Sequence, residues 1–269
     1  MIIFDAHFHL DPAGRCVEAA KDFERAGGSA LMLVSMPYLR AVRGKEDIIE
    51  EYEMLLSIAE KVRRETHIKV FTALGIHPAR ISEFSDVEEG KRVLEEAIDI
   101  AADYIAEKRA CAIGEIGRPH YDVSEEVLEA SNEVIEHAFE AAKDLGCAVI
   151  VHSESAERTY EDLSRIADIA GIDKKRVVKH FSPVTDDTHG LTPSIIATHS
   201  NARSACETMR KFMLESDYMD DTNRPGAVIG PRTLPRTVKK LLEEGFEEKV
   251  GRAMTDMPEE VFGIDLQDS

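Results

Sequence analysis

The amino-acid sequence predicts an α/β protein of one domain, residues 1–269, folded as a (β/α)8 TIM barrel with additional helices at its C-terminal end. Short apolar runs alternate with longer amphipathic stretches along most of the chain, which indicates right-handed β-α-β units around a parallel sheet. About eight such repeats in 269 residues favour a closed barrel over an open doubly wound sheet. No G-x-G-x-x-G or Walker loop follows the first apolar run, which also disfavours an open nucleotide-binding sheet.

The alternation is clear over the first two thirds of the chain. A strand buried on both faces begins at Met1, because its first four residues are apolar, and we expect it to continue towards His9. Further apolar runs predict strands at 29–36, 68–75, 110–115, 147–152 and 176–180. The amphipathic stretches between them predict helices at 15–26, 46–66, 87–108, 124–145 and 157–170. Gly27, Gly146 and Gly171 directly follow predicted helices, where glycine commonly ends a helix.

The last third of the chain is less regular. Apolar runs predict a seventh strand at 194–198 and an eighth at 211–217. The helices near them are predicted to be short, at 184–190 and 201–210. Two further helices, at 234–245 and 246–261, end the domain, and Pro258 is a candidate break in the second of them.

Composition limits the partners of the protein. The formal net charge of -19 disfavours non-specific binding to nucleic acid or to an anionic membrane, and the basic residues form no sequence cluster that could follow a phosphate backbone. An anionic substrate is still compatible with this charge, because bound metal ions reverse it locally. The four cysteines are far apart and show no C-x-x-C spacing, as in proteins of a reducing compartment. Without a signal segment or an apolar run of membrane-spanning length, we expect a cytoplasmic protein with no membrane partner.

Metal-ligand side chains stand at the carboxyl ends of most predicted strands. Taken singly, each has an ordinary explanation as a solvated strand end, a loop carboxylate or a helix cap. In a barrel these strand ends converge on one face. A converging cluster of imidazoles and carboxylates would be costly to bury without cations, whereas two divalent metals would satisfy it. The predicted ligands are His7, His9, Glu115, His152, His180 and Asp217.

Residues behind two of these ligands should fill the barrel interior. Alternate strand residues point to the same side, so we expect Cys111 and Ile113 to lie beneath Glu115. By the same alternation, Ala148 and Ile150 should lie beneath His152.

Six motifs in order along the chain resemble those of the TatD-like metal-dependent hydrolases, a branch of the amidohydrolase superfamily. The motifs are D-A-H-F-H at 5–9, G-I-H-P at 75–78, G-E-I-G at 114–117, V-I-V-H at 149–152, K-H-F-S at 179–182 and E-S-D-Y at 215–218. The resemblance implies that His7, His9 and Asp217 hold one metal, that His152 and His180 hold a second, and that Glu115 bridges them.

The chain departs from this family's pattern in loops that would contact substrate. Arg118-Pro119-His120-Tyr121 follows G-E-I-G, where the family usually has Leu-Asp, and Phe181-Ser182-Pro183 follows His180, where the family usually has Cys-Phe-Ser-Gly. The short segment between the sixth and eighth strands carries other polar candidates without an assigned role. These are His189, His199 and Arg203, to which His120 is added.

The leading functional hypothesis is hydrolysis of a phosphodiester, in single-stranded DNA or a smaller nucleotide, by a water activated between two divalent metals of the Zn, Mn, Mg or Ni type. Asp217 is the predicted general base. His77 and Arg118 are predicted substrate contacts, although an ordinary loop histidine and a surface arginine are the alternatives. A lactone, amide or phosphotriester substrate is the second hypothesis, and a barrel that binds metal without catalysis is the third. The sequence leaves the oligomeric state open.

Overall fold

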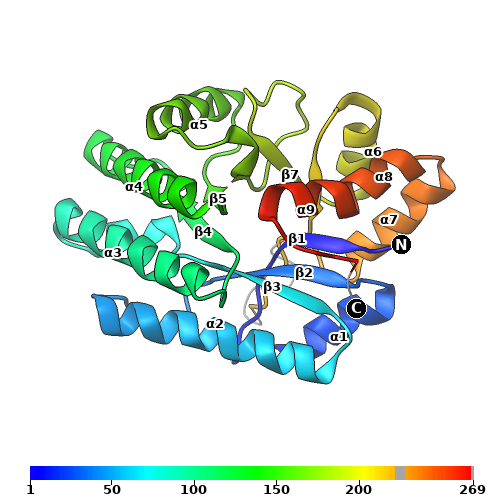
Figure 1. Ribbon diagram of the computed structural model, residues 1–269, viewed down its shortest axis with the longest axis horizontal. Helices are drawn as coiled ribbons and strands as arrows, with labels where there is room; N and C mark the ends of the chain where they lie inside the picture. Colours follow the sequence, from blue (N-terminus) through cyan, green and yellow to red (C-terminus); the bar gives the residue numbers. More distant parts are fainter. Residues whose placement is uncertain (222–227, 268–269) are drawn as a thin grey trace.

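Eight parallel strands, hydrogen-bonded to one another in chain order, form the centre of the molecule in the computed structural model, which describes residues 1–221 and 228–267 (Figure 1). This arrangement confirms the predicted TIM barrel. The strands are β1 (Phe4–Phe8), β2 (Ala30–Val34), β3 (Lys69–Leu74), β4 (Ala112–Gly117), β5 (Ala148–His152), β6 (Val177–Lys179), β7 (Thr192–Ile196) and β8 (Met213–Glu215).

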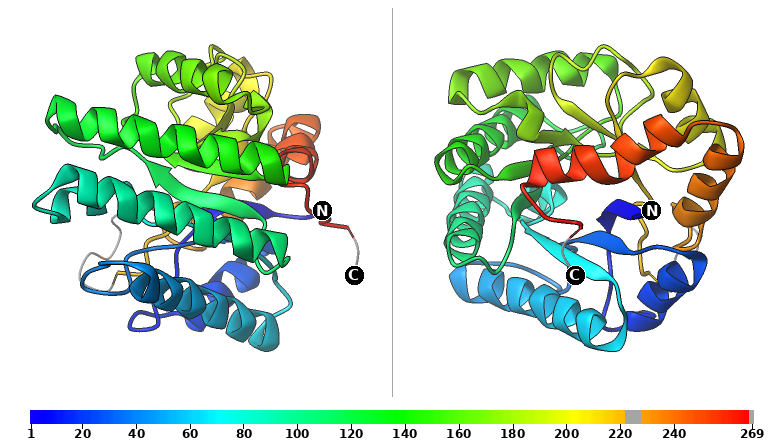
Figure 2. Two further views of the ribbon diagram at one scale, coloured as in Figure 1. Left: turned by 60° about the vertical axis from the view of Figure 1, so that its left-hand side comes forward. Right: turned by 45° about the vertical axis from the view of Figure 1, so that its right-hand side comes forward.

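Helices surround the strands on the outside (Figures 1 and 2). They are α1 (Val17–Ala26), α2 (Lys45–Glu65), α3 (Val87–Ala106), α4 (Glu125–Leu145), α5 (Glu157–Ala170), α6 (His199–Thr208), α7 (Thr233–Glu243), α8 (Glu247–Gly251) and α9 (Met257–Phe262). Short 3-10 helices add η1 (Pro78–Glu83) and η2 (Lys174–Arg176), and a π-helical turn, η3 (Arg252–Asp256), joins α8 to α9. Within the described residues, no helix combines the length and apolar character that a membrane span requires.

The ring closes where β1 meets the segment that follows β8. Asp217 N donates to His7 O at 3.0 Å, and His9 N donates to Tyr218 O at 2.9 Å. The buried carboxylate of Asp5 supports the same seam, because its Oδ1 accepts from Ser216 N at 2.9 Å. The first and last strands are therefore joined at the carboxyl end of the barrel, where the predicted ligands lie.

Apolar side chains fill the barrel interior. Alternate strand residues supply them, among them Phe4 on β1, Met32 on β2 and Ile150 on β5. Helix α9 crosses the opposite end of the barrel (Figure 2) and contributes Phe262, whose ring centroid lies 6.2 Å from that of Phe4. The interior is therefore packed beneath the site and closed at its base.

The interior residues of β5 agree with the prediction, whereas those of β4 agree only in part. Ala148 and Ile150 lie in the interior as expected. Cys111 also packs against it, but Ile113 faces the outer core between strands and helices. The pairing of β4 with β5 shifts between Ile113 and Ile116, so that β4 carries an extra residue. This bulge lets Glu115 face the centre although Ile113 does not.

Four predictions for the last third of the chain need correction. No helix forms at 184–190, where the polar sequence Thr-Asp-Asp-Thr-His offers no apolar face for packing. Strand β7 begins at Thr192, two residues earlier than predicted. Strand β8 ends at Glu215, because Asp217 takes a left-handed backbone conformation with φ 46°. Pro258 breaks no helix, since it lies in the first turn of α9 just after the π-helical turn.

Candidate metal centre

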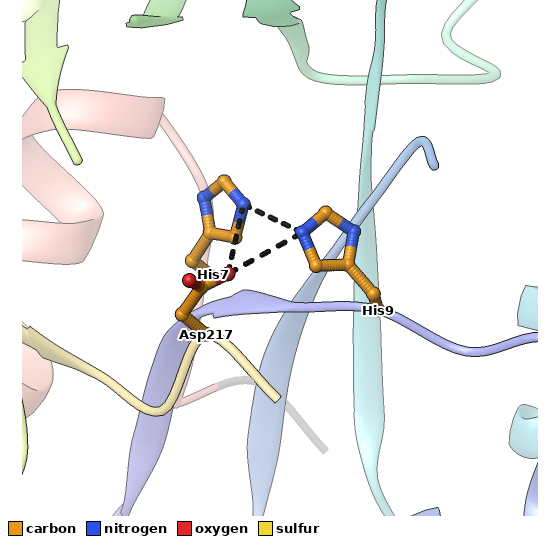
Figure 3. Close-up of side chains that lie close together, drawn as sticks. All are labelled: His7, His9 and Asp217. Carbon is orange, nitrogen blue, oxygen red and sulfur yellow. Dashed lines mark hydrogen bonds and ion pairs between the residues drawn. The ribbon is translucent and has the colours of Figure 1, made fainter. Parts of the chain in front are cut away.

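His7 and His9 leave the end of β1 towards the same point. Their Nε2 atoms are 2.9 Å apart, and both residues are almost completely buried (Figure 3). His9 Nδ1 lies 3.0 Å from Val34 O, so a neutral His9 carries its proton on Nδ1 and leaves the Nε2 lone pair facing His7. His7 Nδ1 has no hydrogen-bond partner among the described residues, so His7 Nε2 carries either a proton shared with His9 or a lone pair that a cation between the rings would bind.

Asp217 completes this first group from the segment after β8. Its Oδ1 lies 3.5 Å from His9 Nε2 and 3.8 Å from His7 Nε2 (Figure 3). The three ligand atoms lie within 4.8 Å of one another, as the atoms around one metal ion do. The left-handed turn at Asp217 directs its carboxylate to this point after the strand has ended.

Glu115, at the bulge of β4, faces both sides of the cluster. Its Oε2 lies 3.1 Å from His152 Nδ1, 3.3 Å from His180 Nε2 and 3.6 Å from His7 Nε2. The neighbouring glycines of G-E-I-G make this placement possible. A Cβ at Gly117, where φ is 142°, would lie 1.9 Å from His152 O. Glu115 therefore lies where one carboxylate could bridge two cations.

His152 and His180, from the ends of β5 and β6, form the other side of the cluster. His152 Nδ1 lies 3.1 Å from His180 Nε2. The rings of His180 and His7 are stacked with centroids 4.1 Å apart, so the two sides are in contact. All six predicted ligands therefore come together at one end of the barrel.

Burial and the neighbouring charges together set the charge of these ligands. It lowers the pKa of His7 to about 4 and that of His180 well below its ordinary value, so both imidazoles are neutral at pH 7, the form that binds metal. Burial alone would raise the pKa of Glu115, but the neighbouring imidazoles, His152 foremost, hold it well below the ordinary range. For His9, the hydrogen bond with Asp217 and the charge of Glu115 outweigh burial and raise the pKa.

The structure adds a buried carboxylate, Glu215, to which the sequence analysis assigned no role. Its Oε1 lies 3.2 Å from His180 Nδ1 and accepts from Phe181 N at 2.7 Å. Proton donation from Nδ1 to this carboxylate leaves the His180 Nε2 lone pair facing Glu115. Glu215 precedes Asp217 by two residues, and this spacing within E-S-D-Y was the signal that could have identified it.

His120 is the second residue whose position the sequence analysis missed. Its Nδ1 lies 2.8 Å from His152 Nε2. A His152 that uses Nδ1 for a metal carries its proton on Nε2, and His120 Nδ1 is placed to accept that hydrogen bond. The signal for His120 in the sequence was the segment after G-E-I-G, which reads Arg118-Pro119-His120 where the family usually has Leu-Asp.

His77 lies at the rim of the cluster, between η1 and the ligands. Its Nδ1 accepts from Ala79 N at 3.2 Å, so a neutral His77 carries its proton on Nε2, the atom 3.8 Å from Glu115 Oε1. Burial lowers the pKa of His77 to about 4. His77 is therefore a neutral donor facing the cluster, and its Nε2 has no lone pair to offer a metal.

The side chains of the other polar candidates pair with groups outside the cluster. Arg118 is buried and donates to Asn132 Oδ1 at 2.8 Å and to Glu154 Oε1 at 3.2 Å. His199 pairs with Glu244 at 2.8 Å, and Arg203 pairs with Glu207 at 3.0 Å, both on the outer helices. His189 pairs with Asp187 at 3.5 Å.

Two cavities meet at the cluster. One, of about 390 Å³, is lined by Glu115, Asp217 and the imidazoles together with Met36, Pro37 and Met219. The second, of about 350 Å³, shares His120, His152, His180 and Asp217 and adds Ser153, Glu154, Ser155 and Phe181. The two cavities therefore adjoin each other at the cluster. The neutral imidazoles of His7 and His180, the ionised Glu115 and the closely spaced donor atoms fit divalent cations of the borderline type.

This combination of a parallel barrel with histidine and carboxylate ligands at its strand ends defines the class of metal-dependent hydrolase barrels. The chain belongs to one family of that class, the TatD-related DNases, whose family model matches residues 4–263.

Relatives and solved structures are similar over nearly the whole length of the chain. The uncharacterized protein MJ1127 of Methanocaldococcus jannaschii is 33% identical, and the alignment covers 98% of this chain and 97% of that protein. The crystal structure of YjjV, a TatD homolog of Escherichia coli K12, is 19% identical, covers 98% of both chains and has a TM-score of 0.71. The organophosphorus hydrolase of Deinococcus radiodurans is 14% identical, with 97% of this chain and 92% of that chain covered and a TM-score of 0.69. The two solved structures support the fold.

Proposed function

We propose that this protein hydrolyses phosphodiester bonds in single-stranded DNA or short nucleotides with two divalent cations. His7, His9 and Asp217 would hold one cation, His152 and His180 the other, and Glu115 would bridge them. When bound, the cations would make a water acidic enough to attack phosphorus near neutral pH and would neutralise charge on the phosphoryl oxygens. Membership of the TatD-related DNase family supports this assignment.

The observation that carries the proposal is the pair of adjoining cavities that meet at the cluster. A phosphodiester has a substituent on each side of its phosphorus atom, and each substituent would occupy one cavity. Phe181 lines the second cavity and is 42% exposed. An exposed ring of this kind can stack on a nucleobase, an interaction that tolerates any sequence.

The side chains have separate roles in this reaction. The attacking water would transfer its proton to the Asp217 carboxylate as its oxygen bonds to phosphorus and the bond to the leaving oxygen breaks. His77 would donate from Nε2 to a phosphoryl oxygen, since its neutral form carries the proton there. Arg118 would reach a phosphate only after exchanging Glu154, so the reaction as proposed does not depend on it.

The first test is nucleotide release from a single-stranded oligonucleotide by metal-loaded protein. We expect Asp217→Asn to lower kcat by about 10²–10⁴-fold, the usual contribution of a general base. Asp187→Asn makes the same chemical change at a side chain that is 83% exposed, and it should leave kcat unchanged. Turnover of a lactone or a phosphotriester together with inactivity on DNA would contradict the proposal and support the alternative substrates.

A further inference from the structure

A further polar pocket, apart from the two cavities at the cluster, lies on the outer face of the barrel between α1 and α7. It has a volume of about 330 Å³ and is lined by Arg25, Arg232, Arg236 and Lys239, with Ala26 as the remaining lining residue. None of these five lining residues carries a negative charge. The two helices lie side by side (Figure 2), although more than two hundred residues separate them in the sequence. The fold thus assembles a basic cluster that the sequence analysis did not expect in so acidic a chain.

A buried carboxylate fixes the geometry of this cluster. Asp22, only 5% exposed, accepts from both Arg25 Nη2 and Arg232 Nη2 at its Oδ1, each at 2.5 Å. Its Oδ2 accepts from Arg15 Nη2 at 2.7 Å. Asp22 neutralises only one of the three guanidinium charges while holding all three groups in place. Arginines positioned in this way match the oxygens of a phosphate.

Arg236 and Lys239 extend the basic cluster along α7. Arg232, Arg236 and Lys239 are spaced by four and three residues, which places them on one face of the helix. All three are exposed. Lys239 Nζ donates to Ala26 O at 2.8 Å, at the end of α1, and so lies against the pocket wall.

The basic cluster is connected to the segment that carries Asp217. Arg15 N donates to Asp220 Oδ1 at 2.9 Å, and Asp220 belongs to the same segment after β8 as Asp217. Helix α1 begins two residues after Arg15, and its ten residues extend over about 15 Å, at 1.5 Å for each residue. Arg15 also binds Asp22 through its side chain, so it lies between the segment that carries Asp217 and the pocket, and a polyanion bound at the metal centre could continue past it.

We propose that the α1–α7 pocket binds a phosphate group, and that this phosphate belongs to the part of a DNA strand that extends beyond the metal centre. The second half of this inference rests on the proposed function, whereas phosphate binding as such does not. In a chain with a net charge of -19, a local excess of positive charge would draw the strand to this face and away from the rest of the surface.

The test compares two variants with the same change in charge. Arg236→Gln/Lys239→Gln removes two lining cations but leaves Asp22 and its three arginines intact. Arg92→Gln/Arg165→Gln removes two exposed cations from α3 and α5. Binding of a fluorescein-labelled, single-stranded phosphorothioate oligonucleotide, which resists cleavage, is measured by anisotropy on metal-loaded protein over a range of NaCl concentrations. The same variants are then titrated with pyrophosphate to separate a strand from a small phosphate ligand.

We expect the pocket variant to bind the oligonucleotide more weakly and to show a salt slope smaller by about 1.4, or about 0.7 for each lost single-strand phosphate contact. The control variant should behave like the wild type. Loss of pyrophosphate binding alone would support the pocket with a small phosphate ligand instead of a strand. Equal binding by the wild type and both variants, or equal weakening in both variants, would overturn the inference. Because binding is measured without turnover, a protein that binds DNA here but does not cleave it would contradict only the proposed function.

Discussion

At the scale of single residues, the second nitrogen of an imidazole decides which nitrogen can bind a metal. His9 is fixed by the Val34 carbonyl, His180 by Glu215, and His152 by His120. His77 has the opposite arrangement, because its Nδ1 accepts from a backbone N–H and its Nε2 must donate. These hydrogen bonds thus separate three imidazoles whose lone pairs face the cluster from one whose N–H faces it.

His120 gives this reasoning a direct test. His120→Phe keeps a ring of similar size but removes the acceptor for His152 Nε2, so we expect affinity for the second cation to fall by about 10–100-fold. His120→Asn offers an amide oxygen in place of Nδ1 and should restore much of that affinity. Competition with a chromophoric chelator measures both. If the Phe variant held both cations as tightly as the wild type, His120 would have no part in orienting His152.

At the scale of elements, Asp22 connects helices from opposite ends of the sequence. It binds Arg15 and Arg25 next to and within α1, and Arg232 at the start of α7. Burial acts to raise its pKa, but the hydrogen bonds from the three guanidinium groups outweigh it and hold the pKa well below the ordinary range. The ionised form is therefore favoured by folding.

A pH series of Asp22→Asn should reveal this contribution. At pH 7 the variant should unfold with a free energy lower by about 1–2 kcal/mol, a modest value because the arginines are half exposed. Since folding lowers the pKa of Asp22, the difference should be complete above the unfolded pKa of about 4 and should shrink as the pH falls below it. Denaturant titrations measure it, with Asp99→Asn, a 66% exposed carboxylate, as the control. A difference that stayed constant down to pH 3 would contradict the assigned role.

The elements that the sequence predicted well are those with local signals. The start of α4 at Ser124 and its end at Gly146 follow from a capping hydroxyl and a left-handed glycine. The ends of β7 and β8 could not be predicted in this way. Pro193 forms part of β7, where a proline is unusual, and Asp217 leaves β8 in a conformation uncommon for a residue other than glycine.

The six candidate ligands could be proposed from the sequence because each stands at or just beyond the end of a predicted strand, whereas the residues that orient them from other elements could not. His120 and Glu215 contact ligands from other elements, and such contacts depend on how the barrel brings strand ends together. The bulge that turns Glu115 inward likewise depends on the pairing of β4 with β5, which leaves only a pair of glycines as its trace in the sequence.

At the scale of the whole molecule, the candidate centre draws its ligands from β1, β4, β5, β6 and the segment after β8. Cations bound there would connect strands around most of the ring, including the seam between the first and last strands. Their effect on stability should therefore extend to global unfolding and not only to the site. Bound cations would stabilise single loops much less, because most loops contribute no ligand.

Thermal unfolding with and without metal measures this coupling. At a free Mn²⁺ concentration 100 times its Kd, binding should stabilise the fold by about 2.7 kcal/mol for each site. For a domain of this size that corresponds to a Tm higher by about 5–10 °C for each site than after treatment with a chelator. Glu115→Gln weakens the ligand that faces both sides of the cluster, so most of the increase should disappear in that variant. Because the chain is strongly acidic, Mn²⁺ could also raise Tm by general screening, and NaCl at equal ionic strength serves as the control. An equal rise with NaCl, or an undiminished rise in Glu115→Gln, would show that the stabilisation does not come from the clustered ligands.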